Sequence, residues 1–258
     1  MTSPFSPPLV DIAYDVRTDT PPGKDPDRFS KTLRRYHWLL WNKPLPNGDF
    51  LFAPGATDRE LRYTLGDSEF SLAPDCMHNT FRHWKRLLPI TQLVPETDAD
   101  VNDRMSFTIG NSIIFPGHRI DGNSTINGAR GLHHQIRDRF DLTLECIRRH
   151  YLHEPHPLER TLGAYQSFFQ RFVSFRGYVC FFLLDDLVDT NDQVRFLLPW
   201  SGFDEPPVPT SVEGYKSYYL GLLTVISARN ARIASQQQSL QREEPDRSER
   251  QPPAVDIR

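Results

Sequence analysis

Apolar and polar positions alternate with a helical period over residues 134–151. Apolar side chains recur every three or four residues, as is typical of the buried face of an α-helix; they are Ile136, Phe140, Leu144, Ile147 and Tyr151. The opposite side carries a narrow polar stripe made of His134, Asp138, Asp141, Glu145 and Arg148. The same spacing places each polar side chain above its neighbour on the helix surface. The pattern therefore predicts one long helix with a buried face and a polar face.

The segment before this helix predicts a β element followed by a glycine-rich loop. In SFTIGNSIIF, Gly110-Asn111 is a two-residue hairpin signal, which we favour over a single long strand. The loop over residues 117–131 holds four glycines and the polar residue Arg130. A polar loop that enters a helix can bind an anion. Its glycine spacing matches neither nucleotide-binding fingerprint, so an ordered surface loop is the simpler interpretation.

The remaining periodicities predict a single α+β domain over residues 9–234. Its long helices should pack with a small, mainly antiparallel sheet. We expect helices over residues 27–41, 78–88, 158–173, 178–188 and 212–234, and short strands over 9–16, 50–52, 61–65 and 194–198. Residues 168–182 contain six Phe and predict the centre of the core. The polar or proline-rich ends, residues 1–8 and 235–258, are expected to be disordered.

Composition restricts the location and the classes of partner. The net charge of −3 provides no global basic field, and it gives no strong indication of nucleic-acid binding. No apolar run is long enough for a membrane span, and the N-terminus lacks the pattern of a signal peptide. The three cysteines are widely separated, which favours a reducing compartment. We therefore predict a cytoplasmic protein with no identified partner.

One acidic motif suggests metal chemistry. Asp185, Asp186 and Asp189 form a DDxxD pattern after an apolar run, which resembles the magnesium-binding motif of class I terpene synthases. A magnesium-dependent diphosphate lyase is therefore one candidate function. However, no second metal motif follows, and an acidic helix end explains the same residues. Histidines and cysteines at zinc spacing are also missing from the sequence. We predict no cofactor and assign no metal ligand.

The main candidate site consists of Arg130 and the polar stripe, that is, Arg130, His134, Asp138, Asp141, Glu145 and Arg148. A solvated helix face with internal ion pairs is one interpretation. The other is a row of carboxylates in a cleft, able to hold a cation or to share a proton. The second interpretation favours a hydrolytic enzyme, such as a nuclease. The leading hypothesis remains a domain that binds a ligand or a macromolecule, and the surroundings of the stripe distinguish the two.

Four stretches of the chain carry a family resemblance. They are DPDRFSKTLRRYHWLLWNKPLPNG, FTIGNSIIFPG, IDGNSTINGARG with IRDRFDLTLECIRRHY, and PLERTLGAYQSFFQRFVSFRGYVCFFLLDDLV. Together they span most of residues 25–230, and they resemble an uncharacterised bacterial family, a domain of unknown function. The resemblance implies a single intact domain and an intracellular bacterial protein. It implies no activity and no catalytic residues.

Overall fold

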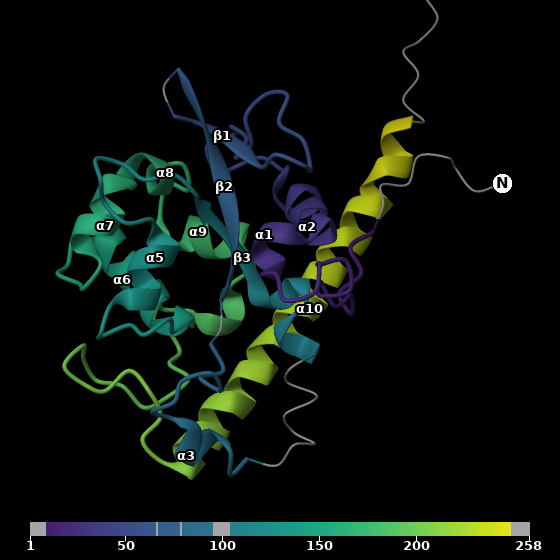
Figure 1. Cartoon of the computed structure of the whole chain (residues 1–258). Helices are drawn as coiled ribbons and strands as arrows, with labels where there is room; N and C mark the ends of the chain where they lie inside the picture. Colours follow the sequence, from purple (N-terminus) through teal and green to yellow (C-terminus); the bar gives the residue numbers. More distant parts are fainter. Residues whose placement is uncertain (1–8, 66, 78, 95–103, 249–258) are drawn as a thin grey trace, which may run out of the picture.

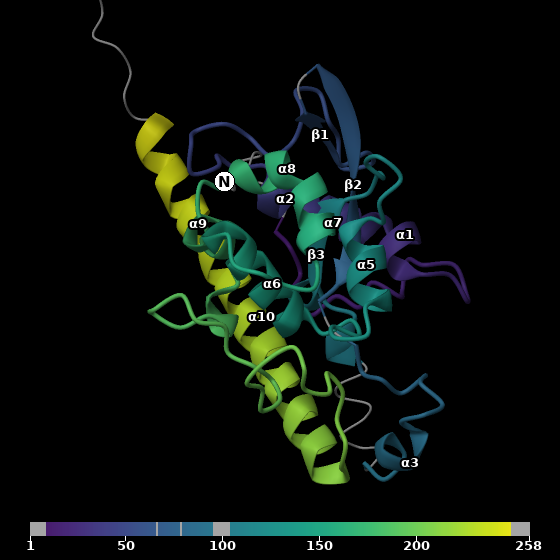
Figure 2. The ribbon, with the colours of Figure 1, turned by 90° about the vertical axis from the view of Figure 1, so that its left-hand side faces the viewer.

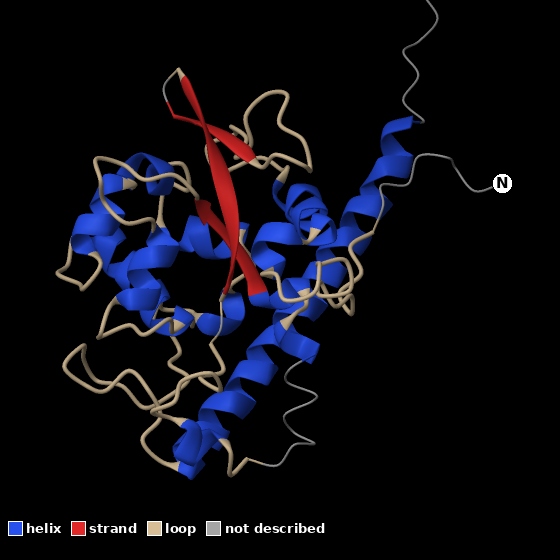
Figure 3. Ribbon diagram, viewed as in Figure 1, coloured by secondary structure: helices blue, strands red, loops and turns tan. Residues whose placement is uncertain are grey.

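The computed structural model describes residues 9–65, 67–77, 79–94 and 104–248. Its fold is α+β, as predicted. A small antiparallel sheet lies between one group of helices, α5 to α9, and a second group formed by α1, α2 and α10 (Figures 1 and 3). Within the described ranges, no helix combines the length and the apolar character needed to cross a lipid bilayer. The predicted disorder of residues 1–8 concerns positions outside those ranges.

The first helical pattern forms two helices rather than one, α1 (Pro26–Phe29) and α2 (Lys31–Trp41). Asp25 caps α1, whose first residue is proline, a residue that favours the first turn of a helix. Ser30 is extended, and its Oγ accepts the N–H of Leu33 at 3.0 Å, which starts α2. A short capping residue therefore interrupts a continuous apolar period.

The sheet has the order β1-β2-β3, from β1 (Arg62–Leu65), β2 (Ser68–Cys76) and β3 (Ser112–Pro116). β1 confirms the strand expected over residues 61–65, whereas β2 was not predicted. Of the hairpin expected over residues 106–115, only the second strand is confirmed, as β3, because a 3-10 turn over Ile109–Asn111 precedes it. The strands expected over residues 9–16, 50–52 and 194–198 are turns or isolated bridges. The helix expected over residues 78–88 is replaced by turns and by the short α3 (Leu88–Thr91).

The long helix expected over residues 134–151 begins later than predicted. α5 (Ile126–Leu132) is followed by a turn, and α6 runs over Phe140–Leu152. Arg137 and Asp138 have φ values of 47° and 64°, and Arg139 is extended. These conformations cannot continue an α-helix. His134 and Asp138 therefore do not share a helix face with Asp141.

The phenylalanine-rich region forms three short helices, α7 (Glu159–Ala164), α8 (Gln166–Gln170) and α9 (Phe175–Phe181). Val173 has a φ of 68° and ends the α8 turn, and Ser174 caps α9. Gly177 is required here, because a Cβ atom would collide with the carbonyl oxygen of Phe172. The predicted core centre is confirmed: the rings of Phe172 and Phe182 are buried with centroids 5.3 Å apart.

The last helix, α10 (Val212–Ser248), runs along one side of the molecule (Figures 1 and 2). Ser211 caps it as expected, since its Oγ accepts the N–H of Gly214 at 3.0 Å. The helix continues to Ser248, beyond the end predicted at residue 234. Residues 249–258 lie outside the described ranges.

α10 carries a buried arginine that joins it to the rest of the domain. Arg229 is 1% exposed and donates to the carbonyl oxygens of Phe182, Ile109, Gly110 and Ser112 at 2.7–3.4 Å. Burial lowers the pKa of Arg229 to about 10, so the guanidinium remains charged at neutral pH. Its hydrogen bonds satisfy carbonyl groups at the end of α9 and at the start of β3.

Candidate functional site

The predicted polar stripe consists mainly of closed ion pairs. Asp141 is fully buried, and its two oxygens accept from Arg139 Nε at 3.0 Å and Nη2 at 2.5 Å. Leu197 N–H also donates to this carboxylate at 2.9 Å. These bonds leave Asp141 no free face for a ligand, so its place on the helix is structural.

Glu145 forms a second, separate cluster on α6. It is 3% exposed and accepts from Arg148 at 2.8 and 2.9 Å and from Arg149 at 2.7 Å. The stripe is therefore neither a solvated face nor a carboxylate row in a cleft. His134 lies outside α6, on the exposed turn before it.

Arg130 and Asp138, by contrast, do lie together. The Arg130 guanidinium is fully buried, and its Nη1 contacts Asp75 at 2.7 Å and Asp138 at 2.9 Å. It also donates to the carbonyl oxygens of Cys76, Met77 and Asp138 and to the hydroxyl of Thr143. Because these contacts occupy the whole guanidinium, Arg130 joins β2, α5 and the following turn and is not available to bind a ligand.

A third acid, Asp27, lies beside this cluster and was not predicted. The Cys76 thiol donates to Asp27 Oδ2 at 3.5 Å. Burial, together with the charges of Asp75 and Asp25, raises the pKa of Asp27 to about 7. Burial also raises the pKa of Asp75 to about 6, since it outweighs the opposing effect of Arg130. One cation therefore faces more carboxyl groups than it can neutralise, and Asp27 holds its proton to a higher pH than an ordinary carboxyl group does.

The cavity beside Asp27 is too small for a substrate. Its volume is about 70 Å³. Small-molecule sites are usually about 300–1,000 Å³, so this cavity lies well below their range. A carboxyl group with a pKa near 7 suits proton transfer. Without space for a reactant, the cluster of Asp27, Cys76, Asp75 and Arg130 is a structural feature of the fold.

A buried histidine and serine resemble a nucleophile pair but have the wrong tautomer. Trp41 Nε1–H donates to His37 Nδ1 at 2.9 Å, so the ring proton of the neutral imidazole is on Nε2. That nitrogen lies 2.9 Å from Ser112 Oγ and donates to it. Burial lowers the pKa of His37 to about 3. His37 therefore cannot accept the Ser112 proton as the base of a hydrolase would.

The acids of the DDxxD pattern are held by arginines and by a turn. Asp186 pairs with Arg232 at 2.9 Å, and Asp185 lies 3.6 Å from Arg176. Asp189 Oδ1 accepts the N–H groups of two later residues in its own turn at 2.8 Å. In the part of the chain that the structure describes, no group of three His, Cys, Asp or Glu residues is arranged to hold a metal ion.

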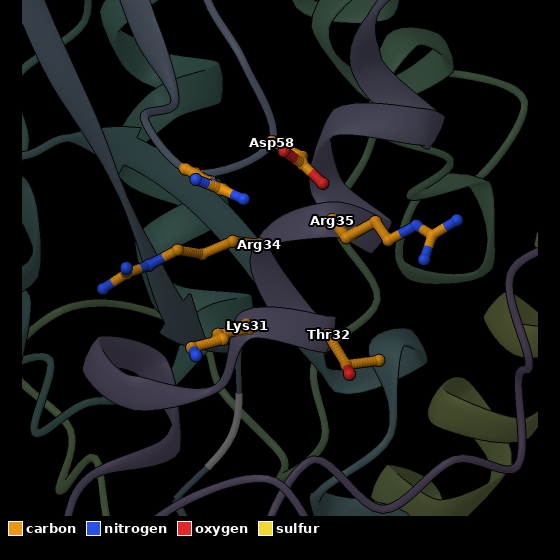
Figure 4. A pocket seen from close by; sticks show the side chains of 6 residues that line it. Lys31, Thr32, Arg34, Arg35 and Asp58 are labelled. Atoms are coloured by element: carbon orange, nitrogen blue, oxygen red, sulfur yellow. The ribbon is translucent and has the colours of Figure 1, made fainter.

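A hollow lined by several cations lies beside α2. Its volume is about 580 Å³, and it lies between α2 and the loop before β1 (Figure 4). Six residues line it: Lys31, Thr32, Arg34, Arg35, Asp58 and Arg59. Lys31 lies about one helical turn from both Arg34 and Arg35, at spacings of three and four, whereas Leu33 and Tyr36 are buried in the core. We call this feature the α2 hollow.

In the described part of the chain, the cations of the α2 hollow outnumber its acids, since Asp58 is the single carboxylate among the lining residues. Among the residues described, no carboxylate forms an ion pair with Lys31, Arg34, Arg35 or Arg59. Figure 4 shows that Arg34 and Arg35 extend in opposite directions from α2, with Asp58 above them. The N-terminus of α2 is already occupied, since Asp19 accepts the N–H of Thr32 at 2.7 Å. Only side chains can therefore recognise an anion here, along an extended surface.

In the sequence, Arg34 and Arg35 with Trp38 could bind nucleic acid, but amphipathic packing explains their helix as well or better, and the hollow itself was not predicted. A further signal was available, because the three cations of α2 outside the core have no acid among them. The contribution of the loop containing Arg59 could not be derived from periodicity.

Comparison with known proteins assigns the chain to one protein family. A model of a family of unknown function (DUF6994) matches residues 10–233. No curated protein and no solved structure matches the chain.

Proposed function

We propose a function for a chain that belongs to the family of unknown function DUF6994: it binds successive phosphate groups of an anionic ligand in the α2 hollow. The observation that carries this proposal is the set of four cations without carboxylate partners in the described structure. Such cations repel one another, and phosphate oxygens relieve that repulsion. Guanidinium groups also match phosphate in geometry through paired hydrogen bonds.

The direction of the side chains favours an extended ligand over a single phosphate. Arg34 and Arg35 extend to opposite sides of α2, so one phosphate cannot contact both at hydrogen-bond distance (Figure 4). A chain of phosphates can pass from one to the other. A nucleic-acid strand and an inorganic polyphosphate share this chemistry. The local charge of the hollow supports either ligand even though the whole chain carries −3.

Hydrolysis by the polar stripe receives no comparable support. Asp141 and Glu145 are both buried in ion pairs with neighbouring arginines.

We also propose that the protein acts in the bacterial cytoplasm, in keeping with its three free cysteines. Fractionation of cells that express the tagged protein tests this location.

The binding proposal is tested with a fluorescent single-stranded oligonucleotide and with inorganic tripolyphosphate. The test variant is Arg34→Gln/Arg35→Gln, and the control is Arg160→Gln/Lys216→Gln, which removes the same charge from exposed positions elsewhere. We expect the test variant to weaken binding about tenfold or more and to reduce the salt dependence by about 0.7 for each lost phosphate contact. The control should bind as the wild type does.

The two ligands distinguish the source of the phosphates. Binding of the oligonucleotide alone identifies nucleic acid, and binding of tripolyphosphate alone identifies a polyphosphate. The proposal is wrong if neither ligand binds, or if both double variants weaken binding equally.

A further inference from the structure

A second hollow, far from α2, combines an aromatic ring with cations. Its volume is about 410 Å³, and its lining includes Trp84, Arg86, His134, Arg137, Pro206 and Pro207. These residues come from three separate segments: the residues before α3, the turn before α6 and the loop before α10. Figures 1 and 2 both place α3 at the end of the molecule away from α2. We call this feature the Trp84 hollow.

The aromatic component of the Trp84 hollow is held in place. Trp84 packs edge-on against the buried Phe81, with ring centroids 5.2 Å apart and an interplanar angle of 77°. Arg137 Cζ lies 5.7 Å from the centroid of the Trp84 ring. Indole and guanidinium planes are the surfaces on which unpaired nucleobases stack. The hollow therefore presents a stacking surface that is already formed.

The direction of Arg137 results from an unusual backbone. Arg137 and Asp138 both have positive φ, which is uncommon for residues other than glycine. The ion pair between Asp138 and Arg130, at 2.9 Å, holds the turn from the inside. Consecutive residues thus point in different directions: Asp138 toward the buried Arg130, and Arg137 toward Trp84. Strain that the surrounding structure maintains is a frequent property of ligand sites.

The charge of the hollow suits an anion. Its lining contains Arg86, Arg137 and the His134 imidazole, and no carboxylate. Neither arginine forms an ion pair with an acid of the described ranges. The nearest acids along the chain are occupied, because Asp138 binds Arg130 and Glu205 accepts from Ser201 N–H and Oγ at 3.0 and 2.6 Å.

We infer that the Trp84 hollow binds a nucleotide, with the base stacked on Trp84 and Arg137 and the phosphate against Arg86 and Arg137. The volume lies within the range of small-molecule sites, about 300–1,000 Å³. Pro206 and Pro207 contribute apolar surface to the lining. The α2 hollow has no aromatic residue in its lining, so it cannot recognise a base. This inference is therefore independent of the proposed function.

Titration calorimetry with a nucleoside monophosphate, with the matching nucleoside and with ribose 5-phosphate tests this inference. The nucleotide should bind, and the two partial ligands should bind about tenfold more weakly or worse, because each lacks one half of the contacts. Arg137→Gln, at a half-exposed position, should weaken nucleotide binding about tenfold. Trp84→Phe should retain most of the affinity, whereas Trp84→Leu should lose it.

The control is Arg160→Gln/Lys216→Gln, whose exposed positions lie outside both hollows, and it should bind the nucleotide as the wild type does. Failure of this inference is distinguishable from failure of the proposed function, because the two tests use different test variants and different ligands. Thermal unfolding of each variant checks that the fold is retained, and Arg137→Gln remains informative if Trp84→Leu unfolds. The inference is overturned if no nucleoside monophosphate binds at millimolar concentration, if ribose 5-phosphate binds equally well, or if Arg137→Gln has no effect.

Discussion

Replacement of Asp27 by asparagine should change how the stability of the protein depends on pH. The pKa of Asp27 is raised from 3.8 to about 7, mainly by burial, with Asp75 and Asp25 adding to the effect. As the pH rises from about 4 to 7, the unfolded chain releases this proton while the folded chain keeps it. The wild type therefore loses stability over that range. The amide introduced by Asp27→Asn cannot ionise, so the variant avoids this loss.

The size of the effect follows from the shift in pKa. One pKa unit corresponds to about 1.4 kcal/mol, so a shift of about three units corresponds to about 4 kcal/mol. Asp27 keeps partial contact with solvent, which reduces the effect. We expect the variant to gain about 2–4 kcal/mol relative to the wild type between pH 4 and pH 8. Most of the gain should be complete once the pH exceeds about 7.

Urea unfolding of both proteins at four pH values between about 4 and 8, followed by circular dichroism, measures this difference. Comparing the two proteins cancels the contributions of other titrating groups, such as His37. Glu159→Gln, on the exposed side of α7, is the matched control, and its difference from the wild type should be small at every pH. A difference between Asp27→Asn and the wild type that does not change with pH would refute the reasoning, because Asp27 would then ionise alike in both states.

Four further variants test the packing by urea unfolding. Phe172→Ala should lower the free energy of unfolding by about 3–5 kcal/mol, because the ring of Phe172 is buried among other aromatic rings. A loss below about 1 kcal/mol would show that this ring is not part of the core centre. Arg139→Met should cost about 3–5 kcal/mol by leaving Asp141 buried without a partner, and Arg139→Met/Asp141→Leu should recover part of the loss. Val173→Gly should stabilise the protein by about 0.5–1 kcal/mol, since the exposed valine has a φ of 68°; destabilisation would show that its side chain packs.

The helical period located α6 correctly but could not find where it begins. Phe140, Leu144 and Ile147 are all buried on one face, as the spacing predicted. Ile136 continues the same period and is also buried, but it lies in the preceding turn. That turn depends on the attraction between Arg130 and Asp138. A pattern of apolar residues carries no information about such a contact.

The candidate site was only partly predictable for a related reason. β2 has few buried apolar residues, and its pairing with β1 and β3 defines it as a strand. Only that pairing brings Asp75 to Arg130 and Cys76 to Asp27. Sequence spacing alone therefore found Arg130 and Asp138 but neither of their acidic neighbours. For the same reason, the sequence offered Trp84 as a residue that could stack on nucleic acid but could not predict the hollow that three distant segments form around it.

The position of Arg229 in the chain has a consequence for protein synthesis. The ribosome makes the acceptors, the carbonyl groups of residues 109, 110, 112 and 182, well before it makes the guanidinium that satisfies them. Until α10 emerges, the growing chain must leave these groups in water, and the core cannot close around them. Folding of the core is therefore completed only late in translation. A product released before residue 229 would expose apolar surface and be a substrate for chaperones and proteases, rather than a partly active binding protein.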